Sequence, residues 1–412
     1  MPHNQYSNDA LGVVDKSNKL WTRTFVTFMG IGFCIFTGFN MLLPTLSLYL
    51  DAQGSTKEQI GLIFSSFALA SITSRMLAAR LSRRFGATNI LRLGLSICFI
   101  GSFMFIIVPH PIFYALGRMM HGAGVGLTST LTASMATQVI PPQRMAEGLG
   151  YLGLGATSAL AFGPLLGLKI STVFGYNILF TSVAFCYVAG MLISLLLPRM
   201  VLASDKSTPI KGIKAYIEPK AIPSSVLILL YGATCCAVTA YLAIYCQEVG
   251  LPSAANFFAI STIGTVSARL FTGRFYDRYG HLRIIPLAVI LLAMSTLSIR
   301  LLPYPTILYI TAVFHGLAQG TLFPSVQALT FSSVPDDRRT VTSALFFNSF
   351  DIGIGIGTTI MGFAAGWLET FKVVYFIGVG FLVIFMVYYL YYYLIRINRR
   401  KRKKPDSVPV SV

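Results

Sequence analysis

Residues 74–86 read SRMLAARLSRRFG, and residues 268–280 read ARLFTGRFYDRYG. A shift of 194 residues superimposes the two stretches and makes four positions identical. The chain therefore contains an internal repeat. The length of this repeat and the apolar stretches around it indicate the fold. The matched positions are Arg75 and Arg269, Arg80 and Arg274, Arg84 and Arg278, and Gly86 and Gly280.

The same shift continues along the chain as far as Arg144, which falls on Arg338. Because chance does not hold one offset over so long a stretch, we interpret the chain as two related halves. Between Gly86 and Arg144, the same shift superimposes His121-Gly122 on His315-Gly316, Gly126 on Gly320, and Pro141 on Pro335.

The composition places these halves in a membrane. Of the 412 residues, 55% are hydrophobic and 11% are charged, whereas a soluble domain has about 25% charged residues. No water-soluble fold hides so much apolar surface, so part of the solvent must be lipid. The net charge of +18 does not indicate nucleic-acid binding, because the cations cluster in alternate connections between apolar stretches.

Twelve apolar stretches are long enough to cross a bilayer, which takes roughly 20 residues. Prolines between them, such as Pro198 and Pro303, mark helix ends. The expected spans are 25–50, 59–80, 88–108, 112–138, 145–173, 176–197, 224–246, 253–273, 284–302, 306–331, 340–367 and 372–395.

The positive-inside rule predicts the orientation of these spans. If the N-terminus lies in the cytoplasm, the inner segments hold 25 lysines and arginines and the outer connections hold 4. We therefore expect a multi-pass protein of the plasma membrane with both termini in the cytoplasm. Arg75, Arg118 and Arg269 are the remaining cations and lie within expected spans.

A polar stretch from Arg199 to Ile222 divides the chain into six spans and six spans. The predicted fold class is thus an all-α membrane protein, with twelve transmembrane helices in two pseudo-symmetric six-helix bundles. The expected parts are a cytoplasmic segment 1–24, a bundle 25–198, a cytoplasmic loop 199–222, a bundle 223–396 and a basic tail 397–412. Parallel halves of this kind place a solute site between them, near the midplane.

The chain contains three short motifs, at Gly273 to Arg283, Arg118 to Gly122 and Gly163 to Gly167. They resemble motifs of the major facilitator superfamily, in particular its twelve-helix proton-coupled drug and small-molecule efflux branch. Gly273 to Arg283 resembles the loop motif after the second and eighth helices, although Arg83 replaces its aspartate in the first copy. Arg118 to Gly122 resembles the fourth-helix motif, with His121 in place of glutamine. Gly163-Pro164-Leu165-Leu166-Gly167 resembles the fifth-helix signature of antiporters, with Leu168 in place of its last glycine.

The loop motif implies a gate at the cytoplasmic ends of the bundles. Asp277 can accept hydrogen bonds from the N-terminus of a neighbouring helix or pair with an arginine. Such a latch stabilises one of two rocking states, whereas the competing interpretation is that the arginines only hold topology. The gating-loop residues are Arg75, Arg80, Arg84 and Gly86, with Arg269, Gly273, Arg274, Asp277, Arg278 and Gly280 in the second half.

Asp351 is the deepest acid in the sequence. It lies 11 residues after Thr340, about 16 Å into its helix at 1.5 Å per residue, and so near the bilayer midplane. An ionised carboxylate there is costly unless it is paired or hydrated. We predict that Asp351 carries the coupling proton; the alternative is a structural bond to a neighbouring helix.

Arg118, His121 and His315 also lie within expected spans. A buried cation facing a cavity is a candidate contact for an anionic or zwitterionic solute, and a histidine pair can relay protons. The alternative is that Arg118 bonds backbone carbonyls and that each histidine satisfies a neighbour. His121 and His315 are thus further proton-coupling candidates, and the cavity candidates are Arg118, Asn40, Gln138, Gln319 and Asn348.

The sequence favours a secondary active transporter that exports a small organic solute in exchange for protons, acting as a monomer without a cofactor. No Walker-type glycine loop indicates ATP coupling, and no nucleophile–base arrangement or metal-ligand spacing indicates an enzyme. Two alternatives remain: export of a carboxylate-bearing metallophore or uptake of an anionic metabolite, and a receptor or scaffold that does not transport.

Overall fold

The computed structural model describes residues 19–107, 110–141, 144–200, 218–251, 254–301, 304–335 and 338–402. Within these ranges the chain is helical and contains no strand. The helices are α1 (Arg23–Ala52), α2 (Lys57–Phe85), α3 (Ala87–Ile107), α4 (Pro111–Val139), α5 (Met145–Phe174), α6 (Tyr176–Ser194), α7 (Ile222–Thr239), α8 (Leu242–Glu248), α9 (Ala254–Tyr279), α10 (His281–Ser298), α11 (Pro305–Phe331), α12 (Arg339–Trp367) and α13 (Val373–Arg402).

Ten helical segments of the described chain are long and apolar enough to cross a membrane. One of them, Pro219–Glu248, contains both α7 and α8, because the expected seventh span is interrupted at Ala240 and Tyr241. The ten do not include α4 and α9. These helices have 29 and 26 residues and are long enough, but their polar residues lower their mean hydropathy. The protein is a multi-pass membrane protein, and the count of twelve spans stays a prediction.

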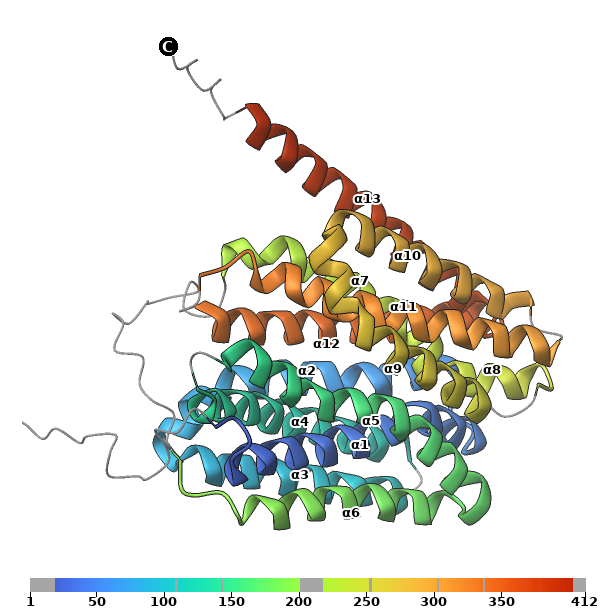
Figure 1. The fold of residues 1–412 in the computed structure, drawn as a ribbon. Coiled ribbons are helices and arrows are strands. Elements are labelled where there is room, and N and C mark those ends of the chain that lie inside the picture. Colours follow the sequence, from blue (N-terminus) through green and yellow to red (C-terminus); the bar gives the residue numbers. More distant parts are fainter. Residues whose placement is uncertain are drawn as a thin grey trace, which may run out of the picture.

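The helices form two bundles that lie side by side (Figure 1). One contains α1 to α6 and the other α7 to α13, and they meet where α2 contacts α12 and α5 contacts α9. The predicted all-α architecture in two bundles is confirmed. We call the end that holds the α1–α2 connection the outer end, because the sequence predicts it outside the cell, and the opposite end the inner end.

The internal repeat appears as equivalent helix packing in the two bundles. In the first, a Cβ on Gly122 of α4 would collide with the backbone of Phe67 in α2. In the second, a Cβ on Gly316 of α11 would collide with the backbone of Ser261 in α9. The shift of 194 residues relates Gly122 to Gly316, and it likewise relates Phe67 to Ser261. Glycine is needed at each position because the two backbones approach so closely.

Two further glycines close equivalent turns. Gly86 between α2 and α3 has φ 86°, and Gly280 between α9 and α10 has φ 73°. L-residues with a side chain rarely adopt this left-handed backbone. The glycines at the ends of the two loop motifs therefore have a direct conformational reason.

The bundles are closed against each other at the outer end. Gly61 of α2 faces α12, where a Cβ would lie 2.6 Å from the carbonyl oxygen of Thr358 and 3.2 Å from Cα of Gly362. Nearby, Nζ of Lys57 lies 5.0 Å from the ring centre of Phe371, a cation–π contact between the bundles. On this side of the boundary, between α2 and α12, the outer end is closed.

The inner end differs from the sequence prediction in one respect. Helix α13 continues to Arg402, into the segment expected as a basic tail, and projects beyond its bundle (Figure 1). Residues 201–217 of the expected central loop lie outside the described residues. Where the chain is described again, Nε of Arg338 donates a 3.0 Å hydrogen bond to Oε2 of Glu218, which ties the start of the second bundle to α12.

The close contact of Gly316 can be tested by a single methyl group. We expect Gly316→Ala to lower the stability of the protein by about 1–3 kcal/mol, because the Cβ can be accommodated only if α9 and α11 separate. Thermal unfolding in detergent measures the effect. Gly380→Ala on α13 is the control, because its Cβ would meet no atom within 4 Å; equal unfolding temperatures for both variants would contradict the packing argument.

The Glu218–Arg338 pair predicts a pH dependence of stability. Burial by itself would raise the pKa of Glu218, but the hydrogen bond from Arg338 and the amide of Lys220 lower the pKa below its ordinary 4.5. The stabilisation is therefore complete above pH 4.5 and is lost as the pH falls through the lowered value.

We accordingly expect Glu218→Gln to unfold at a lower temperature than the wild type at pH 7, with a gap that narrows in acid. Glu369→Gln, in the exposed turn after α12, should show no such gap. A gap that is the same at neutral pH and well below pH 4.5 would argue against the ion pair.

Candidate functional site

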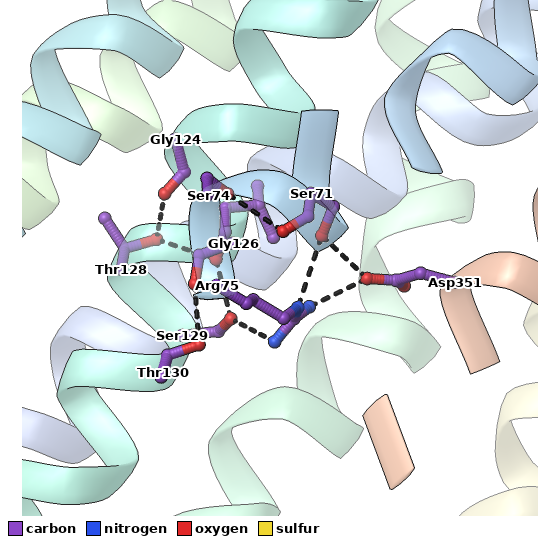
Figure 2. Close-up of polar contacts among 10 residues, drawn as sticks. Ser71, Ser74, Arg75, Gly124, Gly126, Thr128, Ser129, Thr130 and Asp351 are labelled. Carbon is purple, nitrogen blue, oxygen red and sulfur yellow. Dashed lines mark hydrogen bonds and ion pairs between the residues drawn. The ribbon is translucent and has the colours of Figure 1, made fainter. Parts of the chain in front are cut away.

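Asp351 lies at the boundary between the bundles and forms an ion pair across it. Its Oδ2 accepts a 2.8 Å hydrogen bond from Nη2 of Arg75 in α2 and a 2.7 Å bond from the hydroxyl of Ser71 in the same helix. The side chains of Arg75 and Asp351 are only 6% and 9% exposed. Figure 2 shows Asp351 reaching from α12 toward this group on α2.

The sequence of α2 positions both donors. Ser71 and Arg75 are four residues apart, so they lie on the same face of the helix, and Nε of Arg75 also donates to the hydroxyl of Ser71 at 3.2 Å. On the other side of the guanidinium, Nη1 donates to the hydroxyl of Ser129 in α4 at 2.9 Å. The arginine is thus held in one orientation by two helices of its own bundle before it meets Asp351 (Figure 2).

A buried ion pair of this kind is finely balanced. Desolvation costs several kcal/mol for each ion, and the attraction offsets this only with good geometry and additional hydrogen bonds. Here Ser71 and Ser129 supply those bonds. Loss of one charge leaves the other buried and uncompensated, so the energy of the α2–α12 contact depends on whether Asp351 is ionised.

Arg118 has very different surroundings. It is fully buried in α4, and none of its three guanidinium nitrogens has a hydrogen-bond partner in the described structure. Its Cζ instead lies 5.7, 5.2 and 4.8 Å from the ring centres of Phe39, Phe64 and Phe67. Each cation–π contact contributes roughly 0.5–2 kcal/mol, which does not satisfy the five N–H donors of the group.

The two predicted histidines have equivalent positions but different access. His121 is fully buried inside the first bundle, where Nε2 lies 3.1 Å from the hydroxyl of Ser102 and the ring packs against Phe105 and Tyr187. His315 is also hydrogen-bonded to a serine of the preceding helix, with Nδ1 3.5 Å from the hydroxyl of Ser295. Unlike His121, His315 lines a cleft between the bundles.

This cleft opens between α5 of the first bundle and α7, α9 and α11 of the second. The cleft is small: its cavity volume is about 20 Å³, roughly the space of one water molecule. Its wall combines apolar groups with hydroxyl groups and one amide. The lining residues are Leu160, Pro164, Val238, Thr239, Phe258, Ser261, Thr262, Thr265, His315 and Gln319.

The remaining cavity candidates are dispersed. Gln319 lines the cleft, whereas Asn40 is buried against α5, with Nδ2 donating to the carbonyl of Phe36. Asn348 lies on α12 three residues before Asp351, and its Oδ1 has no partner in the described structure. Gln138 is partly buried near the inner end of α4.

The gating-loop residues separate into two groups. Arg80, Arg84, Arg274 and Arg278 are exposed near the inner end, as is Gly273. Arg75 lies apart from them, in the ion pair with Asp351. The side chain of Asp277 lies outside the described residues, so the predicted latch stays a prediction.

The fifth-helix motif packs α5 closely onto α1. A Cβ on Gly163 would lie 2.6 Å from Cβ of Asn40, and one on Gly167 would collide with the carbonyl of Met41. Pro164 faces the other way and lines the cleft. The motif therefore joins helix packing inside one bundle to the space between the two.

Sequence reasoning missed Ser71 and Ser129, and the hydroxyl groups of the cleft wall. A signal was available for part of this set: the repeat shift places Thr265 at the position equivalent to Ser71, and Arg269 at the position equivalent to Arg75. Arg269 lies one turn after Thr265 on α9. Within the described ranges, no group of three histidine, cysteine or carboxylate side chains is placed to hold a metal ion.

The sequence profile of the Major Facilitator Superfamily matches residues 28–305 and 247–411, two overlapping matches that cover most of the chain. The chain belongs to the major facilitator superfamily. Its members are transporters rather than enzymes, and they carry small-molecule solutes across membranes.

Several relatives of this superfamily member are similar in sequence. An uncharacterized MFS-type transporter of Methanocaldococcus jannaschii is 25% identical over 84% of this chain and 90% of its own length. The multidrug resistance protein MdtG of Serratia proteamaculans is 26% identical over 75% of this chain and 79% of its own. The quinolone resistance protein NorA of Staphylococcus aureus is 27% identical over 35% of this chain and 37% of its own.

Solved structures share the fold. The nucleoside transporter NupG superimposes with a TM-score of 0.71 at 16% identity, over 89% of this chain and 99% of NupG. A bacterial homologue of the human lysosomal transporter Spinster, in an inward-facing and occupied conformation, gives 0.69 at 17% identity over 89% and 95% of the two chains. At these identities the likeness concerns the fold alone.

A double-mutant cycle tests the ion pair of this transporter. We expect Arg75→Gln and Asp351→Asn each to destabilise the protein by about 3–5 kcal/mol, because each leaves a buried charge without its partner. The double variant should lose clearly less than the sum of the two. Unfolding free energies in detergent provide the measurement.

The matched control combines Asp351→Asn with Arg92→Gln. Arg92 also lies in a span, but it donates to the carbonyl of Ser194 on α6, away from α12. That pair should be additive within about 0.5 kcal/mol. Additivity of the Arg75 and Asp351 substitutions would show that the two charges do not act together.

Proposed function

We propose that the protein is a proton-coupled secondary transporter that works by alternating access, with Asp351 as the proton-binding group. The observation that carries the proposal is the buried ion pair between Arg75 and Asp351, because it joins the two bundles through a titratable carboxylate. A proton on Asp351 removes one charge of the pair and weakens the contact between α2 and α12. Proton binding thereby changes the relative energies of the two access states.

The closed outer end supports one half of this cycle. Contacts between α2 and α12 extend from Gly61 and Gly362 at the outer end to Arg75 and Asp351 in the middle. Asp351 thus lies on the inner side of the close contacts that Gly61 and Gly362 make. A group at that depth can exchange its proton with one side of the membrane in one state and with the other side after the bundles have rocked.

Similarity to MdtG and NorA, which are named for drug resistance, favours efflux of a small organic solute. The fifth-helix motif, which resembles that of antiporters, favours the same direction. We place the protein in the plasma membrane as a monomer, with both termini in the cytoplasm. His121 and His315 are the less favoured proton carriers, since His121 is enclosed within one bundle.

Uptake of an anionic solute is the second candidate. It is favoured by Arg118, a buried cation whose guanidinium donors are unsatisfied in the described structure. A receptor that binds a solute without moving it is the candidate of another class, and counterflow of labelled solute distinguishes it from a carrier.

Transport in proteoliposomes with an imposed pH gradient tests the proton site. A solute is first selected from a panel by counterflow with the wild type. We expect Asp351→Asn to abolish proton-driven accumulation of that solute, because the amide cannot carry the proton, while counterflow and solute binding persist.

Glu369→Gln is the control, since this carboxylate is exposed in the turn after α12. Acidification or alkalinisation on addition of solute to de-energised wild-type vesicles reports the direction of proton movement. Full accumulation by Asp351→Asn would refute its role as the proton carrier.

A further inference from the structure

Among the charged side chains buried in the membrane-spanning part of the protein, positive groups outnumber negative ones. In the middle of the described helices, the buried side chains that carry a formal charge at neutral pH are Arg75, Arg118 and Asp351. The other buried acid, Glu218, lies at the inner end and pairs with Arg338. Two guanidinium groups are therefore buried with one carboxylate, and their summed formal charge is +1 when all three are ionised.

Asp351 does not neutralise both arginines. Its Oδ2 is directly bonded to Arg75 and Ser71, and it acts on Arg118 only through a longer-range electrostatic attraction. Arg118 has aromatic faces as its neighbours and keeps three nitrogens without an acceptor. A fully buried guanidinium without an acceptor is costly, so a carboxylate or sulfonate that reached it would satisfy the N–H donors that the protein leaves unpaired.

The second bundle adds charge of the same sign. Arg269 on α9 occupies the position equivalent to Arg75, one turn after Thr265 in the cleft wall. The cleft itself presents hydroxyl groups from Thr239, Ser261 and Thr265, and the amide of Gln319, and none of its lining residues is an acid. In the middle of the described helices, Asp351 is therefore the one buried acid, against the buried cations Arg75 and Arg118 and the partly buried Arg269.

We infer that the transported solute is a small organic anion, recognised through Arg118, and that organic cations are excluded. The inference rests on the proposed transport function and specifies its solute class. The partly buried Phe39 is the most accessible ring around Arg118, and the rings of Phe39 and Phe67 lie 4.9 Å apart. These rings provide apolar contact for the body of the solute, while the guanidinium binds its anionic group.

The sign of the charge can be tested with matched compounds. Each compound of a panel carries a carboxylate, an uncharged amide or a trimethylammonium group on the same aromatic scaffold, with scaffolds of one to three rings. Binding to the purified transporter is measured as the ligand-dependent rise in unfolding temperature. We expect the carboxylates to bind the wild type at least about tenfold more tightly than their cationic counterparts.

Variants assign this preference to Arg118. Arg118→Gln should weaken carboxylate binding by about tenfold or more and leave the amides unchanged, whereas Arg92→Gln, which removes a cation elsewhere in the membrane, should change neither. Asp351→Asn removes the opposing negative charge and should tighten carboxylate binding. If Arg118→Gln does not fold, Arg118→Lys and Asp351→Asn still test the inference. Both leave a cation at position 118, so both should keep the preference for carboxylates.

Two results would overturn the inference. The first is that no carboxylate binds better than its cationic counterpart, and the second is that Arg118→Gln leaves the carboxylate affinity intact. Counterflow of the best-binding compound separates the two proposals. Selective anion binding without counterflow supports the solute class and rejects transport, whereas counterflow of a cation supports transport and rejects the solute class.

Discussion

The ion pair between Arg75 and Asp351 is the constraint on which the rest of the site depends. It places opposite charges of two bundles 2.8 Å apart in a region with little solvent, where an unpaired charge is expensive. Anything that alters the charge of Asp351 must therefore alter how α2 meets α12. Under the proposed function, the charge of this carboxylate is linked to the relative position of the two bundles, as an alternating-access carrier requires.

Close backbone packing is what brings the partners of this pair together. On α4, a Cβ on Gly126 would collide with the hydroxyl of Ser74 on α2, so glycine lets α4 approach until Ser129 reaches Arg75. On α12, Gly355 lies one turn after Asp351, where a Cβ would be 2.9 Å from Cβ of Ala68. The glycine content of these helices thus has a functional consequence: short hydroxyl side chains bridge helices only when the backbones are near.

The sequence predicted much of this molecule because the bilayer imposes simple rules. Apolar stretches of sufficient length gave most of the helices, and the shift of 194 residues gave the two halves, which the paired contacts of Gly122 and Gly316 now show as equivalent packing. The depth of Asp351 followed from the helix rise alone. The break between α7 and α8 was not predicted, because the apolar run continues through Ala240 and Tyr241 without a polar or proline signal.

The partner of Asp351 was beyond sequence reasoning. A repeat relates equivalent positions of the two halves, but Arg75 and Asp351 are not equivalent, and 276 residues separate them. Composition, periodicity and the repeat by themselves determined a membrane protein of two related bundles with a few costly charges inside. Only the tertiary structure decided which charges meet: it paired Asp351 with Arg75 and surrounded Arg118 with rings, because side-chain contacts between helices depend on rotation and close approach, which no local pattern encodes.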